Sequence, residues 1–403
     1  MVKKSDLIEV INLQKAKIDI NDLGQIRSAL EKIDETPTEF ALIISGIRRC
    51  GKSTLLNQII RQKKLTSYLY LNFDTTKLFA LELPDFQLLD EIIKENNYEW
   101  LFFDEIQIIE GWEIYVRQKL DEGFKIIITG SNASLLSREL GTKLTGRHIT
   151  KELFPFSLRE FCAYKNLELN ETALVEYLNK GGFPSYIKTE NSDIHTALID
   201  DIIYRDIAVR HKIRDVKSLK LLFQFIATNS TKLISANKLK QYLGVKSTVT
   251  IIEYLHYFEE SYLIQLVSKF SYSQKIQLVN PKKIYFIDNG LQQSVTLSFS
   301  KDEGRKLENM LFWEYRRKGK TIYYFNEKNK ECDFVICQNE KVEELVQVCY
   351  NLNYENQTRE INGLVEAMNF FQLETGTIIT LNQEDTILIE GKRINVIPAF
   401  KIL

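Results

Sequence analysis

The sequence predicts an α/β protein in which a parallel, three-layer core is followed by helical modules and a C-terminal α+β domain. Apolar strand patterns alternate with helical patterns over residues 1–156, which is typical of a parallel sheet with helices on both faces. The pattern is mostly helical to residue 211, and helical and β-rich segments then alternate to the end. We therefore expect four segments with the bounds 1–156, 157–211, 212–298 and 299–403.

The core begins with helical patterns in residues 1–35, which are interrupted at Asn21 and Asp22. Short apolar runs then predict strands, and helical patterns lie between them. The predicted strands are residues 41–45, 67–73, 100–103, 125–129 and 148–153.

The first strand leads into a loop of the form GxxxxGK[ST]. Its two glycines let consecutive N–H groups face phosphates, and the next helix begins with its positive end toward them. Lys52 can reach the outer phosphates, and the Ser53 hydroxyl can ligate Mg²⁺. The loop therefore predicts a P-loop site for ATP and Mg²⁺, with a ligand-free strand-to-helix turn as the alternative. The residues predicted to line the cofactor are Gly46, Ile47, Arg48, Arg49, Cys50, Gly51, Lys52, Ser53 and Thr54.

Polar residues follow two further strands of the core. Asp104 and Glu105 close the third predicted strand, and Ser131 and Asn132 follow the fourth. Because parallel strands present their carboxyl ends at one edge, these residues should lie beside the loop that carries Lys52. Asp104 would hold Mg²⁺, Glu105 would polarise the attacking water, and Ser131 or Asn132 would touch that water or the terminal phosphate. Such residues are ordinarily solvated carboxylates or helix caps, but their order along the chain favours a hydrolytic site.

The composition is that of an ordinary globular protein, with 44% hydrophobic residues, 27% charged residues and a net charge of −1. The five cysteines have no zinc or CxxC spacing, which indicates free thiols in a reducing compartment. The residues after Met1 form a polar helical pattern without the apolar core expected of a signal peptide, and no apolar run approaches about eighteen residues. We therefore expect a cytoplasmic protein with no membrane contact.

Residues 157–211 predict a helical lid, broken at residues 181–184 by a Gly-Gly-Phe-Pro sequence. Ser157 followed by Glu160 predicts a capping box at its first helix.

Three helical patterns and two β-rich runs after the lid predict a winged helix-turn-helix module. The helices are residues 219–228, 236–242 and 247–258, and the strands are residues 263–270 and 283–287, joined by a polar turn. Residues 210–283 hold thirteen Lys or Arg against four acids, a net charge of +9. This charge, with Lys246, Ser247 and Thr248 at the start of the third helix, favours contact with DNA phosphates over a purely structural packing module. No cluster of Arg, Asn or Gln indicates sequence-specific base contacts.

The combination resembles the bacterial and archaeal AAA+ type ATPases that carry a winged helix and a C-terminal restriction-endonuclease-like domain. The resemblance lies in residues 46–54, 101–107, 129–134, 146–147, 153–161, 181–184, 204–206, 284–291 and 308–348. It implies that Pro184 contacts the adenine. It also implies that Arg147 approaches the γ-phosphate, either in its own subunit or across a homo-oligomer.

In the C-terminal domain the resemblance implies a second metal site formed by Glu308, Asp333 and Gln347. Cys349 stands where nucleases of this fold have a lysine, and a thiol cannot replace an ammonium. Arg359 on the next helix is a candidate for a migrated cation. These departures favour a non-catalytic docking module over an active nuclease.

We therefore expect an ATPase in which Lys52, Glu105, Ser131 and Arg147 act at the terminal phosphate. Its nucleotide state would control the lid and a winged helix that is associated with DNA. Two alternatives remain open: a nucleotide-loaded switch that recruits a protein partner with little turnover, and an ATP-dependent nuclease.

Overall fold

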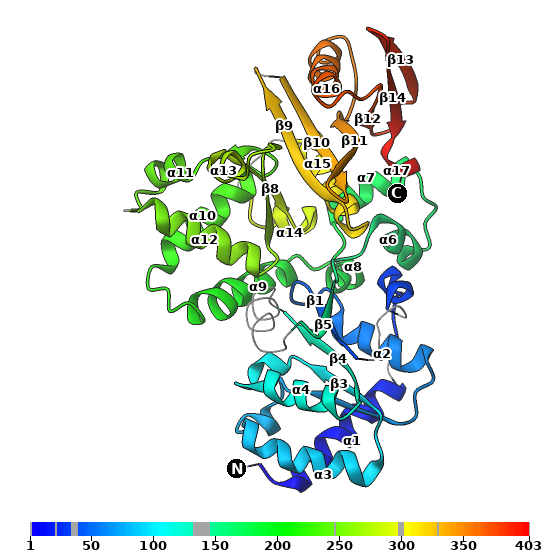
Figure 1. The fold of residues 1–403 in the computed structure, drawn as a ribbon, viewed down its shortest axis with the longest axis vertical. Coiled ribbons are helices and arrows are strands. Elements are labelled where there is room, and N and C mark those ends of the chain that lie inside the picture. Colours follow the sequence, from blue (N-terminus) through cyan, green and yellow to red (C-terminus); the bar gives the residue numbers. More distant parts are fainter. Residues whose placement is uncertain are drawn as a thin grey trace. The chain divides into compact units, whose positions relative to one another are not determined.

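The computed structural model describes residues 2–20, 22–33, 39–131, 146–245, 247–296, 302–328 and 330–402. The chain divides into two compact units, Met1–Phe154 and Pro155–Leu403 (Figure 1). Within the described ranges, no helix combines the length and the apolarity that a membrane crossing requires.

The first unit contains a parallel sheet with the strand order β2-β3-β4-β1-β5. Its strands are β1 Ala41–Ser45, β2 Tyr68–Asn72, β3 Trp100–Asp104, β4 Lys125–Gly130 and β5 His148–Glu152. Its helices are α1 Lys4–Ile20, α2 Lys52–Gln62, α3 Phe86–Asn96 and α4 Trp112–Asp121, with 3-10 turns at η1 Ser28–Lys32, η2 Thr76–Leu78, η3 Leu83–Asp85 and η4 Ile106–Ile108. All five predicted strands are confirmed, and their order places β4 between the strands that carry the acidic pair and the phosphate loop.

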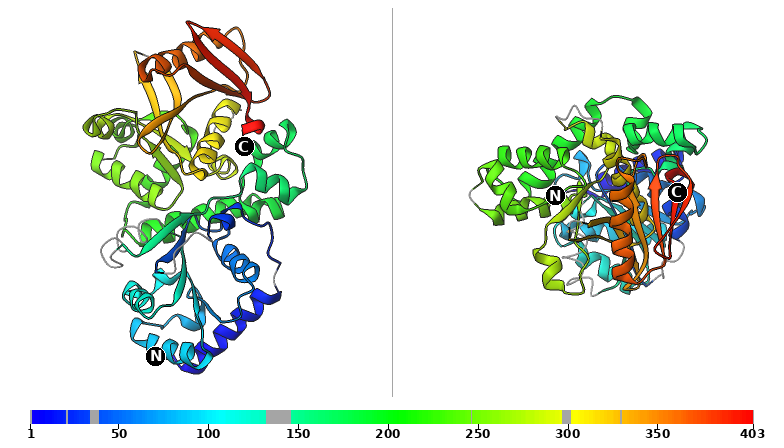
Figure 2. Two further views of the ribbon diagram at one scale, coloured as in Figure 1. Left: turned by 45° about the vertical axis from the view of Figure 1, so that its right-hand side comes forward. Right: turned by 90° about the horizontal axis from the view of Figure 1, so that it is seen from above.

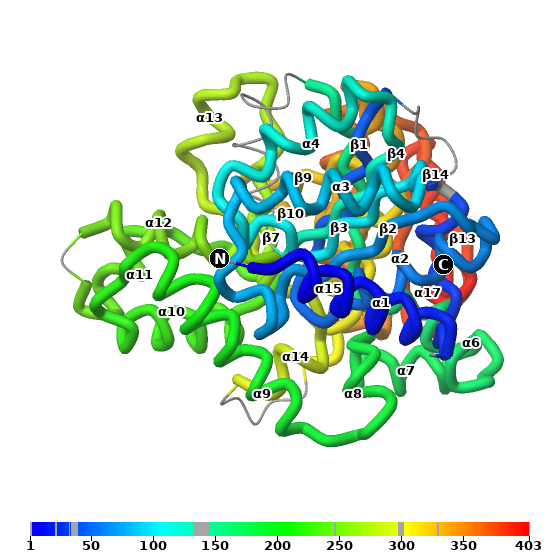
Figure 3. Tube along the Cα trace, turned by 90° about the horizontal axis from the view of Figure 1, so that it is seen from below, coloured from blue at the N-terminus to red at the C-terminus, as the bar shows by residue number. Residues whose placement is uncertain are grey.

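Helices cover both faces of this sheet. Leu69, Phe103 and Ile128 pack in one cluster with apolar residues of α1, α3 and α4, and Figure 3 shows α1 and α3 running beside the strands. Side chains that alternate along a strand face the opposite side, where buried Phe102 and Ile127 lie and where α2 packs. The sheet is thus buried between two helical layers, as its nearly continuous apolar strands require.

The N-terminal residues form fewer helical turns than predicted. α1 covers the first amphipathic pattern, but the second contains only the five-residue η1 among the described residues. The Gln58 side chain explains the extended chain before η1, because its amide donates to the carbonyls of Leu23 and Gln25 at 2.9 and 2.7 Å.

The second unit begins with helices in the region predicted as a lid. They are α6 Leu158–Lys165, α7 Glu171–Lys180, α8 Pro184–Thr189, α9 Asp193–Asp200 and the π-helix η5 Asp201–Val209. The predicted capping box is confirmed, since the Ser157 hydroxyl accepts from the Glu160 N–H at 3.2 Å and the Glu160 carboxylate accepts from the Ser157 N–H at 3.0 Å.

Three helices and a small antiparallel sheet of order β6-β8-β7 come next. The elements are α10 Val216–Thr228, β6 Leu233–Ile234, α11 Ala236–Leu243, α12 Thr248–Glu260, β7 Ile264–Val267, α13 Gln274–Val279, β8 Lys282–Phe286 and α14 Asn289–Gln293. The three helices are confirmed. The polar turn predicted between the two later strands is wrong, because that segment contains the helix α13.

The C-terminal residues form a six-stranded mixed sheet of order β13-β14-β12-β11-β10-β9 (Figure 2). The elements are α15 Glu303–Arg317, β9 Thr321–Glu327, β10 Lys330–Gln338, β11 Lys341–Val348, α16 Gln357–Phe371, β12 Thr375–Thr380, β13 Asp385–Ile389, β14 Lys392–Pro398 and α17 Ala399–Ile402. Leu364 and Met368 of α16 pack on Val335 and Ile378 of the sheet. The β13–β14 hairpin was not predicted.

Candidate active site

The phosphate loop connects β1 to α2, and its backbone has the conformation that the motif requires. Gly46, Arg49 and Gly51 have φ values of 154°, 65° and 104°, so the chain turns sharply before α2 begins at Lys52. The Lys52 side chain is buried, and its ammonium donates to the carbonyl oxygens of Gly46 and Ile47 at 2.9 and 3.1 Å. The cation is therefore held at the loop before any phosphate arrives.

The loop packs tightly against the end of β5. A Cβ atom added to Gly46 would lie 2.1 Å from the Leu153 carbonyl oxygen. The Cys50 thiol also contacts this oxygen, at 3.3 Å, and burial raises the pKa of the thiol, which favours its protonated form. Arg27 fixes the opposite side, because its buried guanidinium donates to the carbonyls of Cys50 at 2.8 Å and Phe154 at 2.6 Å.

Asp104 lies at the carboxyl end of β3 and is fully buried. Its Oδ2 accepts from the Tyr70 hydroxyl at 2.9 Å and from the Asn72 amide at 2.7 Å, and its Oδ1 accepts from the Thr129 hydroxyl. Burial and the neighbouring Asp104 carboxylate raise the pKa of Tyr70, so this phenol remains a donor. These three donors fix the carboxylate rigidly, and a bound Mg²⁺ would be reached through water.

Glu105 follows in a left-handed conformation with φ 57°, which is uncommon for a side chain of this type. Its backbone N–H donates to the Thr129 hydroxyl at 3.3 Å. Its carboxylate accepts from the Gln107 amide and from the Ser131 hydroxyl, the latter at 3.3 Å. Left-handed residues outside glycine often mark functional sites, and this one turns a partly exposed carboxylate out of the buried strand.

The strand register brings these residues to one edge of the sheet. Ser45 pairs with Gly130 across β1 and β4, and Asn72 pairs with Asp104 across β2 and β3. The phosphate loop, the acidic pair and Ser131 therefore share the carboxyl edge, as predicted. Asn132 lies outside the described residues.

The residues present fit ATP and Mg²⁺. The start of α2 presents N–H groups, Lys52 supplies a buried ammonium, and the exposed Ser53 hydroxyl lies in the first turn of the helix. Asp104 supplies an anchored carboxylate.

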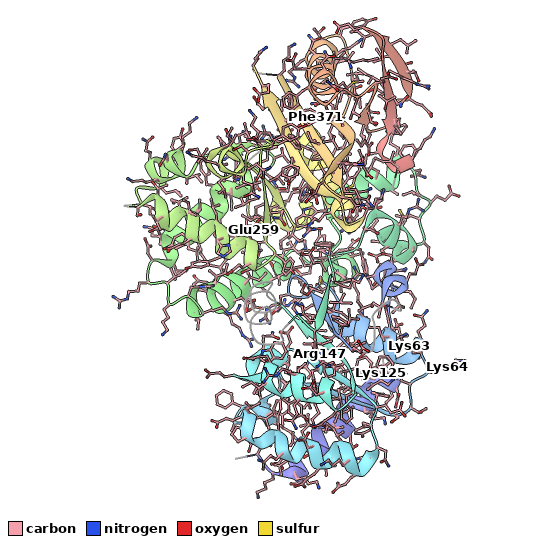
Figure 4. All side chains as sticks on the ribbon, viewed as in Figure 1. Lys63, Lys64, Lys125, Arg147, Glu259 and Phe371 are labelled. Atoms are coloured by element: carbon pink, nitrogen blue, oxygen red, sulfur yellow. The ribbon has the colours of Figure 1, made fainter. Side chains whose placement is uncertain are left out.

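The role predicted for Arg147 in its own subunit is wrong. Ala41 pairs with His148 at the amino ends of β1 and β5, and the Ala41 N–H donates to the Arg147 carbonyl. Arg147 therefore lies a full strand away from the phosphate loop, where it pairs with Asp121 of α4 (Figure 4). Its role across an oligomer remains a prediction.

Pro184 lies at the first turn of α8 in the second unit. Phe183 before it is fully buried, and the Gly182 N–H donates to Asp288 at 2.6 Å. The Gly-Gly-Phe-Pro sequence is therefore a tightly held turn, and adenine contact by Pro184 remains a prediction.

The second metal site is not found as predicted. Glu308 and Asp333 converge, but the ammonium of Lys283 lies between them at 3.1 and 2.8 Å. Gln347 donates to Glu360 at 2.6 Å, and its own oxygen accepts from the Asp333 N–H. Within the described ranges, no group of three or more His, Cys, Asp or Glu side chains is arranged to hold a metal ion.

The charge of +9 over residues 210–283 overstates the positive surface of this segment. Lys220, Lys269 and Lys283 pair with acids that lie outside the segment. The predicted recognition helix α12 contains no lysine or arginine, and Lys246 before it lies outside the described residues.

Sequence reasoning missed the residues that support the site. Tyr70, Asn72 and Thr129 come from strands on either side of β3, and Arg27 reaches the loop from far upstream. A polar residue at the end of a predicted apolar strand is the only local signal, and it points to Asn72 and Thr129. Nothing local indicates Arg27.

Comparison with known proteins agrees with this geometry. Residues 38–162 match the AAA domain, and residues 171–302 match a domain of unknown function, DUF8612. The uncharacterized protein MJ1544 of Methanocaldococcus jannaschii is 35% identical over 437 residues, which cover 100% of this chain and 96% of that protein. An uncharacterized protein of Haemophilus influenzae is 32% identical, over 83% of this chain and 88% of that protein. The chain belongs to this family of AAA-domain proteins.

Solved structures with distant likeness to the AAA-domain protein include AMPPCP-bound DnaA from Aquifex aeolicus. That match has 15% identity and a TM-score of 0.31, and covers 58% of this chain and 86% of DnaA. A STAND protein with a tetratricopeptide repeat sensor from Pyrococcus horikoshii matches with 13% identity and a TM-score of 0.28, over 74% of this chain and 47% of that chain. The AAA assignment of the first unit rests on the sequence match and on its own phosphate loop.

The close approach of Gly46 to β5 gives a first prediction. Gly46→Ala should destabilise the AAA-domain protein by about 2–4 kcal/mol and weaken nucleotide binding, because the new methyl group meets a backbone carbonyl. Urea unfolding and binding of a fluorescent ATP analogue measure both effects. Gly123→Ala is the matched control, since Gly123 also has a positive φ, 89°, but has no atom within 4 Å of the added Cβ. Equal losses of stability in the two variants would show that the positive φ of Gly46, and not its close contact with Leu153, causes the effect.

Proposed function

We propose that this AAA-domain protein binds ATP with Mg²⁺ and hydrolyses it to ADP and phosphate. The observation that carries the proposal is the meeting of Lys52, Asp104, Glu105 and Ser131 at one edge of the sheet. Mg²⁺ would offset the charge of the β- and γ-phosphate oxygens. The Lys52 ammonium would transfer its hydrogen bonds from the loop carbonyls to phosphate oxygens. Glu105 would orient the attacking water and accept its proton.

Nucleotide state would reach the second unit through the chain segment of residues 153–156. Within the first unit, this segment is held by the contact of Cys50 with Leu153 and of Arg27 with Phe154. Within the second unit, the Phe156 N–H donates to the Gly182 carbonyl at 2.7 Å. These contacts support a coupling in which a change at the phosphate loop is transmitted to the lid.

The proposal includes a winged helix in the second unit. Its support is the order α10, β6, α11, α12, β7 and β8, with the short β6 paired to β8. It also includes an endonuclease-like C-terminal domain, supported by the order α15, β9, β10, β11, α16 and β12. We propose no nuclease activity for it, because Lys283 engages the carboxylates that would hold the metal.

The winged helix has two candidate partners, DNA and a protein. Contact with DNA is supported by the basic side chains of α11, where Lys238 is exposed. A nucleotide-loaded switch that recruits a protein is supported by α12, which exposes Val249 and Ile252 at 61% and 55% and has no lysine or arginine. All five cysteines are free, buried thiols, which fits a reducing, cytoplasmic location.

ATPase rates with and without single- and double-stranded DNA separate these candidates. If DNA is the partner, it should raise turnover several-fold, and Lys238→Ala combined with Lys240→Ala should remove the increase. Each lost phosphate contact should also lower the slope of log affinity against log salt by about 0.9. Lys77→Ala combined with Lys94→Ala is the matched control, because it removes the same charge from exposed lysines outside this module, and it should keep the stimulation. No response to DNA, together with ADP retained through gel filtration, would favour the protein switch.

A further inference from the structure

Lys283 of β8 is a lysine with its charge buried inside the second unit. Its side chain is only 3% exposed, and its Nζ lies 2.6 Å from Glu331, 2.8 Å from Asp333 and 3.1 Å from Glu308. Glu308 belongs to α15, and the other two carboxylates belong to β10. The lysine therefore reaches from the three-stranded sheet into the acidic site of the C-terminal domain.

Carboxylates surround the Lys283 ammonium at this site. It donates to the carboxylates of Glu308 and Asp333, and it forms a third ion pair with Glu331. The carboxylates have further partners, since Asp333 accepts from the Val348 N–H at 3.0 Å and Glu308 accepts from the Tyr285 hydroxyl at 2.7 Å. The three carboxylates around the ammonium would repel a phosphate.

The charges at the site favour a protonated Lys283 that is paired with the acids around it. Burial opposes the charged form of Lys283, but Asp333 and Glu308 outweigh burial and hold the pKa of the lysine well above its ordinary value. Burial, reinforced by Asp333 and opposed by Lys283, raises the pKa of Glu308 to about 7. Tyr285 stacks on Phe312 with ring centroids 4.2 Å apart, which closes the apolar side of the site.

We propose that Lys283 is the built-in cation of this acidic site, where it takes the place of a divalent metal and fastens β8 to the C-terminal domain. The site would then be a joint between two modules and not a metal-dependent centre. Shortly after β8, Asp288 accepts from Gly182 of the lid turn at 2.6 Å. One short segment thus connects the lid turn to the acidic site, so the joint would carry any movement of the lid to the C-terminal domain.

Replacing Lys283 by methionine tests the joint in the full-length protein. Lys283→Met should lower the midpoint of thermal unfolding of the second unit by on the order of 10 °C, because it leaves buried carboxylates without a cation. Lys275→Met is the matched control, since Lys275 is exposed on α13 of the same module, and it should change the midpoint little. A Lys283→Met protein as stable as the control would overturn the proposal.

A second variant separates charge from packing. Asp333→Asn added to Lys283→Met removes one of the uncompensated charges and should recover about half of the lost midpoint. If Lys283→Met alone does not fold, recovery of folding in the double variant would support the proposal equally. No recovery would mean that the Lys283 stem matters only for packing, which would overturn it.

Metal binding provides an independent test, because it counts bound ions and does not depend on the unfolding midpoint. Mn²⁺ titrated into wild type and into Asp333→Asn, and followed by electron paramagnetic resonance, should show the same number of bound ions. One ion fewer in Asp333→Asn would mean that wild type binds a metal at the acidic site, and would overturn the proposal.

Discussion

Replacing Lys52 by alanine should weaken ATP binding by roughly 100-fold, which corresponds to about 2.7 kcal/mol. The ammonium is buried at the phosphate loop and its present acceptors are the carbonyls of Gly46 and Ile47. A triphosphate offers negatively charged acceptors in their place, so the ammonium gains the attraction between opposite charges in addition to its hydrogen bonds. Isothermal titration calorimetry with a non-hydrolysable ATP analogue measures the loss directly.

Lys63→Ala is the matched control for Lys52→Ala. Lys63 caps the opposite end of α2 and is exposed (Figure 4). The same charge is removed from the same helix, so affinity should remain within about twofold of wild type. An equal loss in both variants would show that the overall charge, and not the loop, binds the nucleotide. Unchanged affinity in Lys52→Ala would remove the ATP proposal itself.

The sequence predicted β1 to β4 of the first unit well because each is a short apolar run with a polar residue at or just after its end, whereas β5 is mostly polar. It did not predict the strand order, since periodicity carries no information on which strands are neighbours. That order matters for the site: β4 lies between β1 and β3, so Thr129 can hold both the carboxylate of Asp104 and the N–H of Glu105.

The predictions for Arg147 and Lys283 fail for the same physical reason. A local sequence pattern carries no information on partners that are distant along the chain. The resemblance predicts Arg147 near the phosphate, but the parallel register of β1 and β5 fixes it at the other edge of the sheet. The net charge of residues 210–283 includes Lys283, whereas the acids that pair with this lysine come from α15 and β10. The net charge of a segment therefore overstates its exposed positive charge when its lysines pair with acids from other parts of the chain.

Glu105→Gln should bind ATP as wild type does and hydrolyse it about 100- to 10,000-fold more slowly, the usual loss when a general base is removed. The amide keeps the size of the carboxylate and can still accept from Ser131 and Gln107, so the left-handed turn at residue 105 is retained. It cannot accept a proton from water. Phosphate release under saturating ATP measures turnover, and an affinity within about threefold of wild type would show that only the chemical step is affected.

Glu110→Gln is the matched control for this variant, because Glu110 is an exposed carboxylate in the same loop before α4. Its turnover should equal that of wild type. Equal hydrolysis by wild type and Glu105→Gln would contradict the role of Glu105, and the base would have to be sought elsewhere. Loss of ATP binding in Glu105→Gln would instead place Glu105 among the groups that shape the loop. Retained binding with lost turnover is the one result that the anchored Asp104 and the projecting Glu105 predict together, since the first would hold the cofactor and only the second would meet the water.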